Sequence, residues 1–250
     1  IERFSGLLND DAEIHTPYGA TEAVPIISIR SREILTETRQ LSEKGYGICI
    51  GRPINDIDIR IIRISDDPIE SWRDDLTVSQ GEIGEITVKG ALVSRRYFEN
   101  PDADALAKIK EGRQIRHRMG DLGWMDKKGR LWFCGRKSHR VITAQETLFT
   151  IPCEAIFNNH PQLFRSALVG VGSRPRQRPV IIAELEKTAS PINYQMLEKE
   201  LLSMAASNKL TQSIQTVLFH KAFPVDIRHN SKIFREKLTV WAEKKLKQKK

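Results

Sequence analysis

The chain has 250 residues, of which 40% are hydrophobic and 29% are charged, and its formal net charge is +8. This composition suits a soluble globular protein with one large domain or two smaller ones. No apolar run approaches the roughly 18 residues that a membrane-spanning helix needs. The positive charge is concentrated in residues 244–250, which favours a solvated helix end or tail. We therefore expect neither a transmembrane segment nor a nucleic-acid partner.

The three cysteines, Cys49, Cys134 and Cys153, lie far apart in the sequence. Their odd number and wide spacing argue against a disulfide framework and against a zinc site. Free thiols persist in a reducing compartment, so the sequence favours a cytoplasmic location.

An unusual group of side chains occupies positions 18–22, at the end of the segment His-Thr-Pro-Tyr-Gly-Ala-Thr-Glu that starts at His15. The ring of Tyr18 can stack on a planar base, and Gly19 allows the backbone to approach a ligand. Thr21 and Glu22 can bind phosphate oxygens and Mg²⁺, a hard cation that prefers oxygen ligands. By local chemistry alone, a turn between a strand and a helix is favoured, because short motifs have many chance matches. Residues 24–41, which contain the polar groups 31–33 and 37–39, indicate the start of a helix or an irregular segment.

Residues 45–135 form a β-rich region punctuated by glycines. Strands are predicted around residues 48–50, 57–61, 83–90 and 131–134, and the alternating isoleucines at 57, 59 and 61 give one of them a buried face. Several short strands of this kind predict a small β-barrel or sandwich. Within this region, residues 102–110 are predicted to be helical, with acidic residues in the first turn.

A second unit is predicted from about Arg136 onward. Its expected strands are residues 164–171, 180–185 and 217–219, and a helix starts with Pro152 at its first position. Mixed strands and helices make this unit α+β. A second helix is predicted to open at Pro191 and to bury one apolar face, formed by Met196, Leu197, Leu201 and Met204. A third helix is predicted to be capped by Asn230 or Ser231 and to bury a stripe of Phe234, Leu238 and Trp241.

Four motifs in order resemble the signatures of the adenylate-forming superfamily, which includes acyl-CoA synthetases, peptide-synthetase adenylation domains and luciferases. They are Tyr18–Glu22, Gly120–Gly123, Gly135–Lys137 and Asn230–Ile233. Each motif alone is weak, but four in the right order across residues 18–233 make a specific match. The resemblance covers essentially the whole chain.

The resemblance implies a role for each motif residue in ATP and AMP binding. Tyr18, Gly19 and Ala20 would contact adenine, Asp121 would accept hydrogen bonds from the ribose, and Arg136 would contact the nucleotide. Thr21 and Glu22 would be catalytic residues that also hold Mg²⁺.

Two further roles concern the C-terminal part of the chain. Lys232, placed by its sequence context at a helix start, would stabilise the charge that develops during acyl-AMP formation. Ser138 would be the hinge between the domains, because a small residue can absorb a backbone rotation. Met119, Ser138 and Ser231 depart from the common family pattern, which indicates a subgroup.

The implied architecture is α/β and α+β. Residues 1–136 would be the C-terminal portion of the large nucleotide-binding domain, with a barrel-like β-subdomain at about 45–135. Residues 137–250 would be a mobile α+β domain. The family also has a Lys-containing loop, rich in Ser, Thr and Gly, that binds the β- and γ-phosphates, and no such loop is present. The sequence is therefore expected to be roughly the C-terminal half of an enzyme and to be inactive by itself.

Three longer stretches, residues 117–123, 131–141 and 228–238, most resemble the β-lactone synthetases of long-chain olefin biosynthesis. This resemblance implies ATP-dependent adenylation of a carboxylic acid, either a long-chain fatty acid or a β-hydroxy fatty acid, with pyrophosphate release and then β-lactone closure. One alternative is a fatty acyl-CoA synthetase that uses CoA as the acceptor, and another is a non-catalytic module that retains the fold. The chain has no Gly-x-Ser-x-Gly elbow of a hydrolase. The sequence does not indicate an oligomeric state.

Overall fold

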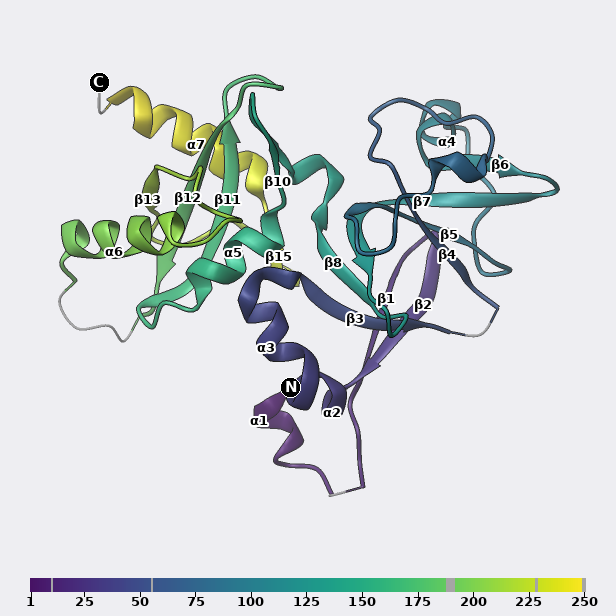
Figure 1. Ribbon diagram of the computed structural model, residues 1–250, viewed down its shortest axis with the longest axis horizontal. Helices are drawn as coiled ribbons and strands as arrows, with labels where there is room; N and C mark the ends of the chain where they lie inside the picture. The colour runs from purple at the N-terminus through teal and green to yellow at the C-terminus, as the bar shows by residue number, and fades with distance from the viewer. Residues whose placement is uncertain (10, 55, 188–191, 228, 249–250) are drawn as a thin grey trace. The chain divides into compact units, whose positions relative to one another are not determined.

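The computed structural model describes residues 1–9, 11–54, 56–187, 192–227 and 229–248, and it describes residues 229–231 by their backbone only. The chain divides into two compact units (Figure 1). Unit 1 comprises residues 1–42 and 47–138, and unit 2 comprises residues 43–46 and 139–250.

Unit 1 is built on one antiparallel sheet (Figure 1). Its strand order is β1-β2-β3-β8-β7-β5-β4, which differs from the order along the chain, and β6 pairs with β7. Its strands are β1 (His15–Ala20), β2 (Ala23–Arg30), β3 (Ile48–Pro53), β4 (Asp58–Ile62), β5 (Gly84–Lys89), β6 (Lys108–Glu111), β7 (Gln114–Met125) and β8 (Leu131–Arg136). The predicted strands at 48–50, 57–61, 83–90 and 131–134 are thereby confirmed. Ile59 and Ile61 are buried, as the alternation indicated.

The sheet of unit 1 is strongly curled but open. The hydroxyl of Tyr18 on β1 lies 2.6 Å from a carboxylate oxygen of Asp121 on β7, although β2, β3 and β8 separate these strands in the sheet. A closed barrel requires its edge strands to pair with each other. Between the described residues of β1 and β4 no such pairing is present, so the prediction of a barrel or sandwich was wrong in this respect.

Residues 24–41 differ from the prediction. Residues 23–30 form strand β2, which places Ile27 and Ile29 in the core, and the helical part begins only at Ser31. It is made of α2 (Ser31–Glu33), α3 (Arg39–Leu41) and the π-helical turns Ile34–Thr38 and Ser42–Tyr46. The motif at residues 18–22 therefore ends a strand and enters a hairpin turn, not a helix.

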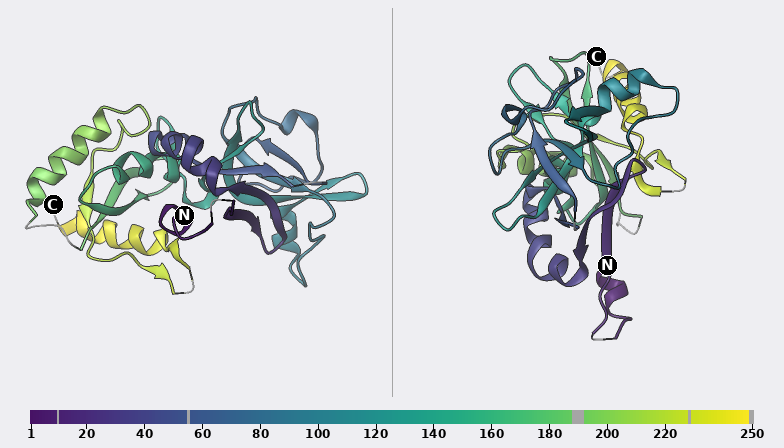
Figure 2. Two further views of the ribbon diagram at one scale, coloured as in Figure 1. Left: turned by 90° about the horizontal axis from the view of Figure 1, so that it is seen from below. Right: turned by 90° about the vertical axis from the view of Figure 1, so that its right-hand side faces the viewer.

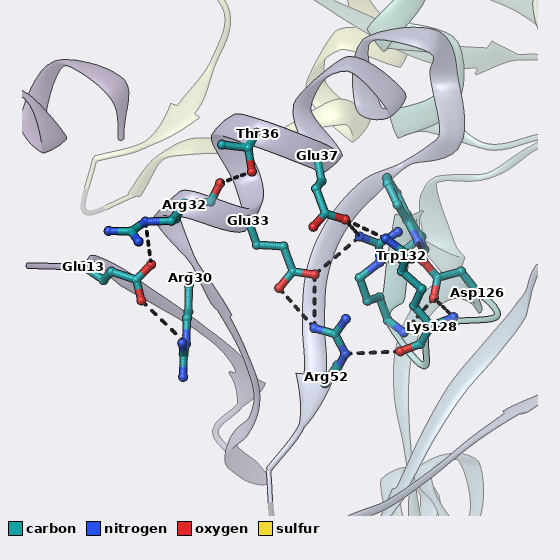
Figure 3. Close-up of polar contacts among 11 residues, drawn as sticks. Glu13, Arg30, Arg32, Glu33, Thr36, Glu37, Arg52, Asp126, Lys128 and Trp132 are labelled. Carbon is teal, nitrogen blue, oxygen red and sulfur yellow. Dashed lines mark hydrogen bonds and ion pairs between the residues drawn. The ribbon is translucent and has the colours of Figure 1, made fainter. Parts of the chain in front are cut away.

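Charged side chains attach this helical segment to the sheet (Figure 3). Glu33 binds Arg52 of β3 at 3.1 Å, and Glu37 binds Lys128 in the turn between β7 and β8 at 2.8 Å. Both glutamates also contact the guanidinium of Arg130, at 3.4 and 3.1 Å. Arg130 is buried, whereas Arg52 and Lys128 are exposed, and exposed ion pairs such as Glu37–Lys128 contribute about 1 kcal/mol or less each.

The remaining helices of unit 1 are short. They are α1 (Glu2–Ser5), α4 (Pro101–Ala107) and the 3₁₀ turn Asp74–Leu76. The side chain of Asn100 caps α4 by accepting a hydrogen bond from the amide of Ala103, and Pro101 occupies the first turn. The helix predicted at 102–110 is confirmed in its first part only, because residues 108–110 belong to β6.

Unit 2 has a three-stranded sheet in the order β11-β12-β13, with helices on both faces (Figure 2). Its elements are β9 (Val141–Ile142), β10 (Thr147–Leu148), α5 (Thr150–Asn158), β11 (Leu163–Val171), β12 (Arg178–Leu185), α6 (Tyr194–Ala206), β13 (Val217–Phe219), β14 (Val225–Asp226), β15 (His229–Ile233) and α7 (Arg235–Gln248). Side chains alternate between two cores: Leu168 and Ile181 pack toward α5 and α6, while Val169 and Val180 pack toward α7. The predicted α+β character and the three strands are confirmed.

Several helix details of unit 2 differ from the predictions. Pro152 is the third residue of α5, not the first. Met196 is 59% exposed, and the buried face of α6 is formed by Leu197, Leu201 and Ala205. The predicted helix opener, Pro191, lies outside the described residues.

The last helix, α7, begins at Arg235, so Asn230 and Ser231 belong to strand β15 and cannot be its caps. Its predicted apolar stripe is confirmed in part: Leu238 is fully buried and Trp241 packs against the same core, whereas Phe234 precedes the helix.

The three cysteines are buried free thiols. Burial raises the pKa of Cys49 to about 11 and that of Cys134 to about 12, so both are protonated at neutral pH. In the part of the chain that the structure describes, no helix combines the length and apolar character needed to cross a membrane.

Candidate functional site

Three residues from separate motifs meet in unit 1. The hydroxyl of Tyr18 donates a hydrogen bond of 2.6 Å to Oδ2 of Asp121, and Nε of Arg136 lies 3.1 Å from Oδ1 of the same carboxylate. Asp121 and Arg136 face each other on the paired strands β7 and β8. The ring of Tyr18 also lies 6.3 Å, between centroids, from the ring of Phe133 on β8. Tyr18, Asp121 and Arg136 are called the trio below.

Asp121 lies within the long strand β7, although its neighbours Gly120 and Gly123 are of the residue type that favours turns. Between the pairs Thr87↔Arg118 and Glu85↔Leu122, the three residues 119–121 of β7 face only Ile86 of β5. Gly120 adopts a φ of +66° in this bulge, a conformation that side chains disfavour. Bulges of this kind can redirect neighbouring side chains, and Asp121 is one of the three residues in this bulge.

Burial raises the pKa values of Tyr18 and Asp121. Desolvation raises the pKa of Asp121, while the nearby Arg136 and the hydrogen bond from Tyr18 act in the opposite direction. Desolvation, followed by the charge of Asp121, raises the pKa of Tyr18 well above its usual value, so its phenol stays a donor. Oδ1 of Asp121 is buried, and no donor among the described residues makes a well-directed hydrogen bond to it. A carboxylate oxygen in that state can accept a hydrogen bond from a ligand hydroxyl.

A pocket of about 430 Å³ lies beside the trio within unit 1. Two residues of the motif at 18–22, Ala20 and Glu22, line it together with Arg136. Glu22 accepts a hydrogen bond of 2.7 Å from the hydroxyl of Tyr97, and this bond is the main reason why the pKa of Glu22 lies below its usual value. Thr21 is exposed in the turn between β1 and β2.

The structure gives Gly19 a packing reason that the sequence did not. A Cβ added to Gly19 would lie 2.5 Å from the carbonyl oxygen of Ala23 and 2.9 Å from Val24 in its own hairpin. The absent side chain therefore permits the tight turn between β1 and β2, which sets the positions of Ala20 to Glu22. A close approach of Gly19 to a ligand stays a prediction.

Several residues of this pocket were not predicted from the sequence. His117, buried on β7, accompanies Glu22 in the pocket wall, and desolvation lowers its pKa to about 4, so it is neutral at pH 7. Arg118 pairs with the fully buried Glu85 at 2.7 Å, and Lys137 reaches the other oxygen of that carboxylate at 2.9 Å. Residues far apart in the sequence make these pairs, so no local pattern could indicate them.

The other two predicted residues are Lys232 and Ser138. Lys232 belongs to unit 2, where it is exposed on β15, three residues before α7 begins at Arg235; it is therefore on a strand, not at a helix start. Ser138 is exposed in the 3₁₀ turn Lys137–His139, where unit 1 ends. Their predicted roles stay predictions.

Among the described residues, no group of three or more His, Cys, Asp or Glu side chains could hold a metal ion by itself. Protein sites commonly bind Mg²⁺ through one or two carboxylates together with substrate phosphates. Glu22 supplies a carboxylate at the pocket wall, and its Oε1 accepts a hydrogen bond from Tyr97.

Comparison with protein families finds no family whose profile matches the chain. Individual proteins do match it. The chain is 44% identical over 247 residues to an olefin β-lactone synthetase of Xanthomonas campestris pv. campestris, covering 97% of the chain and 44% of that protein. It is 44% identical over 251 residues to an olefin β-lactone synthetase of Stenotrophomonas maltophilia, covering 98% of the chain and 45% of that protein. The chain thus spans less than half the length of these relatives.

More distant relatives include a 2-succinylbenzoate–CoA ligase of Geobacillus kaustophilus, 27% identical over 179 residues and covering 71% of the chain and 32% of that ligase. Among solved structures, the O-succinylbenzoate coenzyme A synthetase of Bacillus subtilis in complex with AMP matches with a TM-score of 0.67 and 22% identity. That match covers 90% of the chain and 40% of the synthetase. The same synthetase has also been solved with ATP and a magnesium ion.

Proposed function

We propose that the chain belongs to the adenylate-forming superfamily and forms the C-terminal part of an enzyme that activates a carboxylic acid with ATP, a proposal supported by its similarity to two olefin β-lactone synthetases and a CoA ligase. In this reaction a carboxylate oxygen attacks the α-phosphorus of ATP, the bond to the leaving phosphate oxygen breaks, and the products are acyl-AMP and pyrophosphate. The observation that carries the proposal is the trio, because it presents a buried carboxylate with an unfilled acceptor beside an aromatic ring and a guanidinium.

Each member of the trio has a role in this proposal. Asp121 accepts hydrogen bonds from the ribose hydroxyls, since Oδ2 has a second lone pair beyond the one used by Tyr18, and Oδ1 accepts no well-directed hydrogen bond from the described residues. The ring of Tyr18 stacks on adenine, with its hydroxyl fixed by Asp121. The half-exposed guanidinium of Arg136 is able to contact ribose or phosphate oxygens.

Glu22, with Thr21, would hold Mg²⁺, which offsets the negative charge of the triphosphate when it is bound. Lys232 contributes a second positive charge from unit 2. An ammonium group directed at the reacting carboxylate and α-phosphate stabilises the charge that develops as the new bond forms. Ser138 would allow unit 2 to turn between the two half-reactions.

The second half-reaction that we propose is closure of a β-lactone. The β-hydroxyl of the activated acid attacks its own acyl carbonyl, the acyl–phosphate bond breaks, and AMP and a proton are released. The similarity at 44% identity to two proteins named olefin β-lactone synthetases supports this choice, and it favours a β-hydroxy fatty acid as the substrate. The more distant similarity to a CoA ligase keeps thioester formation with CoA as the alternative. Consumption of CoA by the full-length protein would decide for the thioester.

The central test uses the full-length protein that contains this chain. Lys232→Ala should lower the rate of pyrophosphate release about 100-fold or more, which corresponds to roughly 3 kcal/mol of lost transition-state stabilisation. Substrate binding should change little, since Lys232 acts on charge that appears only in the transition state. Lys209→Ala, which removes an exposed lysine elsewhere in unit 2, is the matched control and should behave as the parent.

Two results would contradict the proposal. Pyrophosphate release by Lys232→Ala at the parental rate would remove Lys232 from the reaction. Failure of the parent to form acyl-AMP from any fatty or β-hydroxy fatty acid would instead favour a non-catalytic module that retains the fold.

A further inference from the structure

The segment 94–97 is bound to Glu22 at two points within unit 1. The amide of Ser94 donates a hydrogen bond of 2.8 Å to the backbone carbonyl of Glu22. The hydroxyl of Tyr97 donates a hydrogen bond of 2.7 Å to Oε1 of the Glu22 side chain. One contact fixes the backbone of Glu22 and the other fixes its carboxylate, although 75 residues separate Tyr97 from Glu22.

The same segment is itself held firmly. The ammonium group of Lys108, a residue that is only 7% exposed, donates to the carbonyl oxygen of Ser94 at 2.8 Å and to its hydroxyl at 2.9 Å. This ammonium also lies 5.0 Å from the centre of the Tyr97 ring, within the range of a cation–π contact. The amide of Tyr97 donates to Oδ1 of Asp104 on α4 at 2.8 Å. These four contacts therefore fix the position from which Tyr97 reaches Glu22.

This arrangement restricts how Glu22 can bind a cation. Oε1 already accepts from Tyr97, and the hydrogen bond sets the rotation of the carboxylate. Both residues line the pocket of about 430 Å³. A carboxylate that is held by a second residue loses less conformational freedom when it binds a metal, and such supporting hydrogen bonds strongly affect metal affinity.

We propose that Tyr97 is a positioning residue, which holds the Glu22 carboxylate in the orientation that receives the divalent cation of the bound nucleotide. This inference rests on the proposed function, because it assigns a supporting partner to the Mg²⁺ ligand of that site. Lys108 and Ser94 hold Tyr97 in place, so the supporting structure extends from Glu22 through the segment 94–97 to β6.

The test compares ATP binding by the full-length protein with saturating Mg²⁺ and with EDTA, both measured by calorimetry. Tyr97→Phe removes one oxygen and keeps the ring over Lys108. We expect the Kd of ATP with Mg²⁺ to rise roughly 10- to 100-fold, and the Kd in EDTA to stay at the parental value. Tyr194→Phe makes the same chemical change on α6 of unit 2 and should alter neither value.

A purely structural role for Tyr97 would weaken binding equally with and without Mg²⁺, and that result would overturn the inference. Lys108→Met, which removes the bonds to Ser94 and keeps the bulk of the side chain, is a second variant and should weaken only Mg²⁺-dependent binding. An unchanged Kd with Mg²⁺ in Tyr97→Phe would overturn the inference as well.

If Glu22→Gln loses the Mg²⁺ dependence while Tyr97→Phe keeps it, the inference fails and the proposed function stands. If Mg²⁺ does not strengthen ATP binding in the parent, the proposed function fails with it.

Discussion

The ion pair between Glu154 and Arg235 gives the sharpest prediction about unit 2. Glu154 on α5 is buried, and Nη2 of Arg235 at the start of α7 lies 2.6 Å from both of its oxygens. Oε1 of Glu154 also accepts a hydrogen bond of 2.8 Å from the amide of Leu168 on β11. One carboxylate thus joins three elements of unit 2. Arg235→Met, which keeps an unbranched side chain and removes the charge, is the perturbation.

The expected cost follows from the burial. Removing one partner of a buried ion pair leaves an uncompensated charge and costs roughly 3 to 5 kcal/mol. The double variant Glu154→Gln/Arg235→Met leaves no buried charge, and its amide oxygen can still accept from Leu168. We therefore expect the double variant to recover most of the stability that the single variant loses.

The pH dependence has a definite sign. Desolvation raises the pKa of Glu154, and Arg235 opposes this increase, so loss of Arg235 should raise the pKa further. A carboxyl whose pKa is higher in the folded state takes up a proton on folding, and its protein loses stability as pH rises from the unfolded pKa to the folded pKa. The penalty of Arg235→Met should therefore be largest at neutral pH and should shrink as pH falls toward the unfolded value of about 4.3.

Hydrogen exchange on the full-length protein measures the loss of stability in each element separately. Protection of the amides of α5, β11 and α7 should fall more than about 100-fold in Arg235→Met at pH 7, since 1.36 kcal/mol corresponds to tenfold. Peptides from unit 1 serve as the internal reference. A single variant as protected as the double variant would show that the pair does not join these elements.

Two further predictions concern unit 1 and the junction. Asp121→Ala should weaken ATP binding by roughly 1.5 to 3 kcal/mol. It should also reduce the preference for ATP over its 2′- and 3′-deoxy forms, which competition binding measures. An unchanged preference would show that Asp121 does not bind the ribose. Limited proteolysis of the 250-residue chain should cut near Ser138 and leave residues from about 138 to 244 as the more stable product, while even protection across Ser138 would show that the two-unit division is mistaken.

The sequence predicted the strands in which apolar residues alternate regularly or form a dense run. The isoleucines of β4 and the dense apolar runs of β11 and β12 indicated strands, and the structure confirms them. The prediction failed for β2, where the helical interpretation gave weight to the polar residues after Arg30. It also failed for Met196, because the helix period alone does not say which of two adjacent apolar residues faces the core.

The residues of the trio could be named from the sequence by resemblance, but their contacts could not be predicted. Tyr18 and Asp121 are 103 residues apart, and they meet only because the sheet curls. In the sequence, the glycines around Asp121 favour a turn, because glycine with φ > 0 is common in turns. In the structure the same property of Gly120 produces a bulge inside a long strand. Tyr97 and Lys108 carry no local signal, since their function depends on distant partners.

The contacts of Lys137 restrict where a hinge can act. The ammonium group of Lys137 lies 2.9 Å from the fully buried Glu85, and it donates to the carbonyl oxygen of Ser65 at 2.9 Å. Turning the backbone at or before Lys137 would break these bonds and leave Glu85 with Arg118 alone, at a cost of a few kcal/mol. Ser138 is the next residue and is exposed. If unit 2 turns during the reaction, the rotation should therefore begin at Ser138, with Arg136 staying beside Asp121. Lys137→Met should then shift the proteolytic cleavage to earlier positions, and cleavage unchanged at Ser138 would show that Lys137 does not set this limit.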